Sequence, residues 1–355
     1  MALEDYGWLD RSIHRIAFGT KVPQDFLLDM EERRYGDHIA RQEIVSPIFV
    51  TGLARAGTTL VLETLARHPQ LATHRYRDMP FVISPIIWRD LSGRFQVAQE
   101  KKERAHKDGL EVNTDSAEAF EEVLWMRAFP DHFGKDGIKL WDTLPSAFVK
   151  DFRRHMQRVI VARDAKGSAQ PRYLSKNNGN ISRLPALKNA FPDARVVVPL
   201  RHPLDHARSL LKQHQLASQS HAESGFARSY VSDIGHFEFG DVHRPFLFEG
   251  MSEIVRDYSP DDYAYWLHYW IAAHRHLAGQ SDIEIVDMER FTNERHIADL
   301  LARLELDPCA DVVRSAQEQI RPIKRYDGSP DADAETVEAA MAIYEQMRNR
   351  KDCLL

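Results

Sequence analysis

The sequence predicts an α/β protein of the P-loop type, with three layers: a central parallel sheet, helices on both of its faces, and additional helical excursions. Short apolar segments alternate with segments of helical composition, which is the pattern of a parallel sheet. The first expected strand, Pro47-Ile48-Phe49-Val50, runs directly into a glycine-containing turn and then into a helix-forming segment, residues 60–66. Further strands are expected at residues 173–175, 195–200 and 283–286.

The rest of the chain fits one domain over residues 1–355. At 355 residues with 43% hydrophobic side chains, the chain can bury one large core. The sequence of residues 100–165 predicts mostly helix, and the chain contains no internal repeat. The expected parts are an N-terminal helical extension (1–43), a core (47–215), an inserted flap without clear periodicity (218–258) and a C-terminal helix (334–350).

Composition excludes several classes of protein. A formal net charge of −6 argues against binding to nucleic acid through bulk electrostatics. Cys309 and Cys353 are too few for a disulfide framework, which favours a reducing compartment. No signal peptide or membrane span is evident, so we expect a soluble, cytoplasmic protein. The histidines form no H-E-x-x-H pattern, and we expect no metal.

The loop from Gly52 to Thr59 has the spacing G-x-x-x-x-G-T-T, which is that of a Walker A loop with threonine in place of lysine. Glycines allow successive backbone N–H groups and the start of the next helix to face one anion. Without the lysine, hydrolysis of a magnesium nucleotide is disfavoured, and Arg55 must supply the positive charge. The alternative interpretation is an ordinary tight turn between strand and helix.

A second candidate anion site follows the expected strand at 195–200. Arg201 ends that strand, Pro203 suits an early helical position, and Ser209 lies two turns along the helix. An arginine fork and a hydroxyl in this arrangement can bind one phosphate. The alternative is that Arg201 pairs with Asp205.

Together these two segments resemble PAPS-dependent sulfotransferases, where PAPS is 3′-phosphoadenosine 5′-phosphosulfate. The loop resembles the family's R-S-G-T-T phosphosulfate loop, with Ala56 in place of the usual serine, and Arg201 to Ser209 resembles its R-x-P-x-x-x-x-x-S element for the 3′-phosphate. The resemblance covers residues 47–215, which it makes the nucleotide-binding core, and is closer to the bacterial and tyrosylprotein-sulfotransferase-like branch than to cytosolic aryl enzymes. The nucleotide-binding residues that it implies are Arg55, Ala56, Gly57, Thr58, Thr59, Leu60, Arg201 and Ser209, with Arg321 and Lys324 as weaker candidates.

The resemblance also implies catalytic residues. Sulfuryl transfer builds negative charge that fixed cations stabilise, and Arg55 and Lys176 are the candidates. The aryl branch places a basic histidine two positions after this lysine, but this chain has Asn178 there. The branches that this chain resembles more closely use a carboxylate shortly after the phosphate-loop helix, which implies Asp78 as the first candidate for the base, with pairing to Arg75 or Arg77 as the alternative role. The reserve candidates for the base are Glu118, Glu121, Glu122 and, with less support, His106.

The expected function is transfer of a sulfuryl group from PAPS to a hydroxyl of a small molecule, by metal-independent in-line displacement that releases adenosine 3′,5′-bisphosphate (PAP). Two alternatives stay open: an ATP-dependent small-molecule kinase with a degenerate Walker loop, and a nucleotide-binding protein without chemistry. The identity of the acceptor and the oligomeric state are open as well. Aromatic residues of the flap either line an acceptor pocket or pack the flap itself, namely Phe226, Tyr230, Phe237, Phe239, Phe246 and Phe248.

Overall fold

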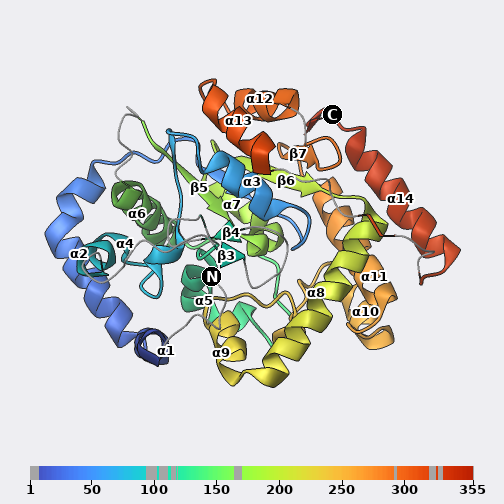
Figure 1. Ribbon diagram of the computed structural model, residues 1–355, viewed down its shortest axis with the longest axis horizontal. Coiled ribbons are helices and arrows are strands. Elements are labelled where there is room, and N and C mark those ends of the chain that lie inside the picture. The colour runs from blue at the N-terminus through green and yellow to red at the C-terminus, as the bar shows by residue number, and fades with distance from the viewer. Residues whose placement is uncertain are drawn as a thin grey trace.

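A parallel sheet runs through the centre of the molecule (Figure 1). The computed structural model describes residues 8–92, 102–103, 111–112, 117, 119–163, 170–291, 294–319, 325–326 and 331–354. Within these residues, six strands form one sheet in the order β2-β5-β1-β6-β7-β8, and every pairing in it is parallel. The strands are β1 (Ile48–Val50), β2 (Leu71–Ala72), β5 (Arg172–Lys176), β6 (Arg195–Leu200), β7 (Glu284–Asp287) and β8 (Cys353–Leu354); β3 (Lys102–Glu103) and β4 (Glu111–Val112) form a separate antiparallel pair.

The predicted fold class is confirmed. The strand expected at residues 195–200 is found with the same bounds, and the other three expected strands differ from β1, β5 and β7 by a single residue at their ends. The edge strands β2 and β8 were not predicted. Each has two residues, which is too short for any alternation of apolar and polar side chains to be visible in the sequence.

Helices cover both faces of the sheet because successive strand residues point to opposite sides. In β1, Ile48 and Val50 pack into the core beneath α3, whereas Phe49 packs into a second core with α6 and α7. The α12 and α13 helices lie beside α3 at the top of Figure 1. The covering helices are α3 (Thr58–Leu65), α12 (Glu294–Arg303) and α13 (Ala310–Gln319) on one face, and α6 (Ser146–Arg163), α7 (Leu184–Ala190), α8 (Pro203–Glu223), α11 (Tyr263–Ala278) and α14 (Ala334–Arg348) on the other.

The N-terminal extension contains two helices, α1 (Trp8–Gly19) and α2 (Val22–Ala40), which lie at the left of Figure 1. The α2 helix packs against α4 (Pro85–Ser92) and α6. The α1 helix reaches the flap, where His14 Nε2 lies 2.9 Å from Asp233 Oδ2. The His14 ring also packs against Phe226 and Tyr230, so these two flap aromatics contribute to packing.

The segment expected to be an irregular flap is largely helical. The α8 helix continues to Glu223, and two further helices, α9 (Gly225–Asp233) and α10 (Met251–Asp257), follow it. Ser224 caps α9 by accepting a hydrogen bond from the Ala227 N–H at 3.2 Å. The mixed Ser, Gly and His content hid these helices, because it weakens the apolar periodicity on which the prediction rested.

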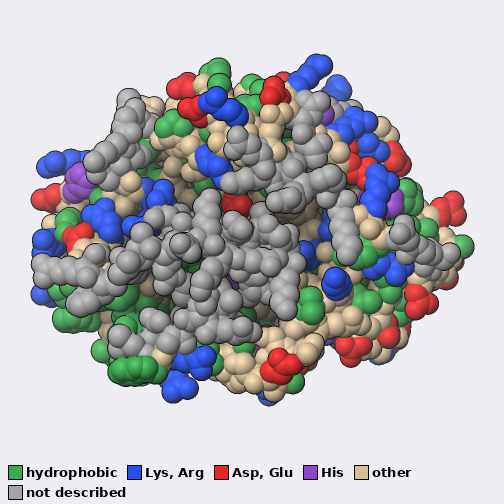
Figure 2. All heavy atoms as spheres, viewed as in Figure 1, with side chains coloured by type: hydrophobic (Ala, Val, Ile, Leu, Met, Phe, Trp, Pro, Cys, Tyr) green, Lys and Arg blue, Asp and Glu red, His purple; other side chains and the backbone are tan. Residues whose placement is uncertain are grey.

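Charged side chains of both signs are interspersed on the face shown in Figure 2. Several apolar side chains of α1 and α2 are exposed, among them Trp8, Val22 and Phe26. In the part of the chain that the structure describes, no helix is both long and apolar enough to cross a membrane.

A buried histidine on α11 predicts a pH dependence of stability. His274 stacks on Trp270 with a centroid separation of 3.7 Å, and burial lowers its pKa to about 4. Below about pH 6.5 the unfolded chain therefore binds a proton at His274 that the native chain does not. We expect the free energy of unfolding to fall from pH 7.5 to 5, with about 2 kcal/mol of the loss from His274.

The measurement is urea unfolding across this pH range for the unmodified chain and for His274→Phe, which retains a ring against Trp270. The variant should show the shallower pH dependence. Parallel curves for the two proteins would contradict the assignment.

Candidate active site

The candidate phosphate loop, from Gly52 to Thr59, joins β1 to α3 at the carboxyl edge of the sheet. Gly52 and Gly57 have φ of 145° and 110°, a region that favours glycine. Arg55 also has a positive φ, of 68°. A non-glycine residue in this region is uncommon and is maintained only where the surrounding structure fixes it. The loop therefore has a defined shape that places Arg55 at its turn.

Two side chains of the β6–α8 segment hold the loop in this shape. Arg201 Nη1 donates to the Arg55 carbonyl at 3.1 Å, and His206 Nε2 lies 2.8 Å from the Ala54 carbonyl oxygen. Trp270 Nε1 donates to His206 Nδ1 at 3.2 Å, so the proton of the neutral ring is on Nε2, which donates to Ala54. Burial, with Arg201 nearby, keeps the pKa of His206 well below its usual value. The ring is therefore a neutral link between α11 and the loop.

The predicted residues of the two anion sites lie together. Arg55 Nε lies 3.4 Å from Ser209 Oγ, and Arg201 Nη1 donates to the backbone carbonyl of Arg55 at 3.1 Å. Burial lowers the pKa of Arg201, but a guanidinium keeps its charge in proteins. Asp205 accepts a hydrogen bond from the Tyr326 N–H at 2.9 Å. These contacts assemble two guanidinium groups and one hydroxyl at the start of α8.

A third strand end completes this edge. Lys176 is the last residue of β5, and its register places it beside Val50 of β1. Two residues later, Asn178 Oδ1 accepts a hydrogen bond from the hydroxyl of Thr58 at 3.3 Å, and the Asn178 carbonyl lies 3.4 Å from Thr51 Oγ1. The β5 end is thus attached to the phosphate loop on both sides of its turn.

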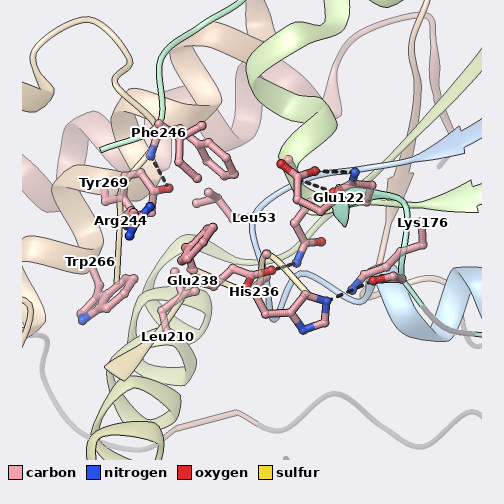
Figure 3. A pocket seen from close by; sticks show the side chains of 18 residues that line it. Leu53, Glu122, Lys176, Leu210, His236, Glu238, Arg244, Phe246, Trp266 and Tyr269 are labelled. Carbon is pink, nitrogen blue, oxygen red and sulfur yellow. Dashed lines mark hydrogen bonds between the residues drawn. The ribbon is translucent and has the colours of Figure 1, made fainter. Parts of the chain in front are cut away.

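A cavity opens beside Lys176, between the phosphate loop and the flap (Figure 3). Its volume is about 30 Å³, so an acceptor must displace side chains to enter. One end is polar, with Lys176, Glu122, His236 and Glu238, and the other end is largely apolar. The lining residues of the apolar part are Leu53, Ile138, Leu210, Phe237, Phe246, Trp266 and Tyr269.

Comparison with known proteins identifies the family of the chain. A model of the sulfotransferase family matches residues 47–238, which is more than half of the chain and includes all three strand ends. The chain belongs to the sulfotransferase family. No protein with a curated description matches the sequence.

Solved structures of bacterial sulfotransferases are similar to this one. Sulfotransferase STF1 from Mycobacterium tuberculosis H37Rv has a TM-score of 0.47 and 17% identity, over 91% of this chain and 82% of the other. Sulfotransferase STF9 from Mycobacterium avium has a TM-score of 0.47 and 13% identity, over 90% of this chain and 80% of the other. A sulfotransferase from Alicyclobacillus acidocaldarius has a TM-score of 0.38 and 14% identity, over 86% of this chain and 96% of the other.

Asp78 does not lie among the residues that line the cavity beside Lys176. It is 1% exposed, is ion-paired with Arg163, and lies 2.9 Å from His74 Nδ1. Burial alone would raise the pKa of this carboxyl, but Arg163 and His74 outweigh it and hold the pKa far below the usual range. A carboxylate so stabilised in its charged form is a poor proton acceptor. These contacts favour the pairing alternative, with Arg163 as a partner, and the Arg75 backbone N–H also donates to Asp78 Oδ2 at 3.0 Å.

The reserve carboxylates Glu121 and Glu122 are buried at the start of α5 (Glu122–Ala128). Glu122 is ion-paired with Arg183 and accepts a hydrogen bond from Asn177 Nδ2 at 2.7 Å. The Arg183 guanidinium stacks on Trp125, with its carbon 3.9 Å from the ring centroid. Both carboxylates thus support the turn after β5. The groups that donate to Glu121, at 3.0 to 3.3 Å, are Trp125 Nε1, Tyr173 OH, Asn177 Nδ2 and Asn180 Nδ2.

Four of the candidate site residues, Arg321, Lys324, Glu118 and His106, lie outside the described residues and stay predictions. Among the described residues, no three histidine, cysteine or acidic side chains cluster as metal ligands. Sequence reasoning missed His206, His236 and Glu238. His206 carried a weak signal, because it follows Arg201 by five positions in the same helix start, whereas His236 and Glu238 have no motif around them.

The role of Asp78 can be tested by Asp78→Asn. Removing this charge leaves Arg163 buried without its counterion, so we expect a loss of about 3–5 kcal/mol in the free energy of unfolding. Folded Asp78→Asn protein should retain sulfuryl transfer. The measurements are urea unfolding and turnover per folded molecule.

Asp257→Asn is the matched control. Its ion pair with Arg256 is exposed and screened by solvent, so we expect the free energy of unfolding to stay nearly unchanged. Abolished turnover in a fully stable Asp78→Asn protein would instead support Asp78 as the base.

Proposed function

We propose that this sulfotransferase transfers the sulfuryl group of PAPS to a hydroxyl of a small molecule and releases PAP. The observation that carries the proposal is that the loop with Arg55, Lys176 and Arg201 lie at the carboxyl ends of three adjacent parallel strands, where Arg55 also contacts Ser209 of α8. In open parallel sheets, ligands bind at the carboxyl ends of the strands. The chemistry of this donor set, three cations and a hydroxyl, fits a ligand with two separate anionic groups.

Each residue has a proposed part in the reaction. The loop from Gly52 to Thr59 and the start of α3 would bind the 5′-phosphosulfate through backbone N–H groups. Arg201 and Ser209 would bind the 3′-phosphate. Because Arg55 Nε lies 3.4 Å from Ser209 Oγ, Arg55 would bridge the two anionic groups of one nucleotide. Lys176 would stabilise charge that develops on the transferred group and the leaving oxygen, together with Arg55.

An apolar acceptor with one hydroxyl suits the cavity. Phe246, Trp266 and Tyr269 would contact its body, and its hydroxyl would face the polar end beside Lys176. The residues support a nucleotide without magnesium better than MgATP, because threonine replaces the Walker lysine that bridges terminal phosphates. The kinase alternative therefore has less support than sulfuryl transfer.

Ligand-induced thermal shift separates PAPS chemistry from the alternatives. PAP should raise the melting temperature in the presence of a chelator, because ligand binding stabilises only the folded protein. ATP with magnesium should have a smaller effect at equal concentration. Stabilisation by MgATP with no effect of PAP would favour the kinase and contradict the proposal.

Removal of Arg55 tests the catalytic half of the proposal. Arg55→Ala should lower kcat by about 10²–10³-fold, since loss of one preorganised donor costs about 3–4 kcal/mol of transition-state stabilisation. Transfer of label from PAPS measures this loss. Lys212→Ala, at an exposed position of α8, is the control and should retain activity. Equal rates in the two variants would exclude Arg55 from the reaction.

A further inference from the structure

Glu238 is a carboxylate of the flap that points into the polar end of the cavity (Figure 3). It lies between α9 and the short 3₁₀ helix Gly240–Val242, and it is half-buried. Its Oε1 accepts a hydrogen bond from Asn178 Nδ2 at 2.7 Å. A chain segment distant in sequence from the phosphate loop thus brings an acidic group next to the end of β5.

Asn178 fixes this carboxylate relative to the phosphate loop. The same side-chain amide that donates to Glu238 accepts from Thr58 Oγ1, and Thr58 is the first residue of α3. Only one side chain therefore separates Glu238 from the helix start that faces the transferred group. Lys176, two residues before Asn178, lines the same end of the cavity. Glu238 consequently lies where an acceptor hydroxyl would meet the sulfuryl group.

The other polar groups of the cavity are less suited to accept a proton. Glu122 is ion-paired with Arg183, which donates to both carboxylate oxygens, and Asn177 Nδ2 also donates to Oε2. His236 Nε2 lies 3.1 Å from the Ala119 carbonyl oxygen, which occupies one of its ring nitrogens. Among the residues that the structure describes, the hydrogen-bond partner of Glu238 Oε1 is the neutral amide of Asn178, which orients the carboxylate without neutralising its charge.

We propose that Glu238 is the general base of this enzyme; the proposal rests on the proposed PAPS-dependent activity. The acceptor O–H bond breaks as its oxygen forms the new O–S bond, and the proton moves to the Glu238 carboxylate. The bond between sulfur and the 5′-phosphate oxygen breaks, and its electron pair stays on PAP. Glu238 then returns the proton to solvent through the mouth of the cavity. Asp78, with its arginine partner, has no part in this step.

The flap thereby has two roles in one segment. Phe237 and Phe246 form part of the apolar wall, and Glu238 between them supplies the reactive polar group. Binding of an acceptor body against this wall would bring its hydroxyl to Glu238. Acceptors that fit the wall poorly would then lose kcat as well as affinity.

The test compares Glu238→Gln with the unmodified chain. Glutamine keeps the shape and can still accept the hydrogen bond from Asn178, but it cannot take up the proton. With labelled PAPS and a panel of substituted phenols, we expect kcat to fall 10²–10⁴-fold. The thermal shift with PAP should be unchanged. Glu249→Gln, at an exposed flap position, is the matched control and should keep full activity.

The acidity of the acceptor gives a readout that a structural role would not produce. A phenol of low pKa needs less help from a base, so the loss in Glu238→Gln should shrink as the acceptor becomes more acidic. A loss that is the same for all phenols would overturn the proposal, as would retained kcat in Glu238→Gln. Loss of activity confined to His236→Gln would assign the base to His236 instead.

Failure of the underlying function is distinguishable from failure of the proposal. If the unmodified chain neither is stabilised by PAP nor transfers label from PAPS, the proposed function fails, and the assignment of Glu238 fails with it. If the unmodified chain transfers label and Glu238→Gln does so equally well, only the assignment of Glu238 is wrong.

Discussion

The site depends on the parallel pairing of β1 with β5 on one side and β6 on the other. Val50 is in register with Lys176 and with Val197, so the three strands end at one edge. The phosphate loop follows β1, Lys176 ends β5, and Arg201 follows β6. A slip in register would move these groups apart by whole residues, so the hydrogen bonds of the sheet set the spacing of the cations.

Buried polar groups stabilise the parts of the site that the sheet does not hold. The turn after β5 is fixed by Glu121 and Glu122, whose oxygens accept hydrogen bonds from Asn177, Asn180 and Arg183. The phosphate loop is fixed by Arg201 and by neutral His206. Such networks are costly unless every member is paired, and these members have partners of matching chemistry.

Sequence reasoning could propose site residues where the candidates lie close together in the chain. The loop at Gly52 to Thr59 and the pair Arg201 and Ser209 were found because one turn and one helix start contain them. It did not find the partner of Asp78, because Arg163 lies 85 positions away and only the fold brings the two together. Glu238 could not be recognised from the sequence for the same reason, because its hydrogen-bond partner Asn178 is 60 positions away.

The donor and acceptor halves of the site come from different kinds of structure. Strand ends and the first turns of α3 and α8 form the donor half, while flap residues such as Phe237 and Phe246 and the α11 residues Trp266 and Tyr269 form most of the acceptor wall. If the proposed assignment holds, the acceptor wall can be redesigned for new substrates without altering the strands proposed to bind the donor. Trp270 sets the limit to such redesign, since its contact with His206 ties the same helix to the phosphate loop.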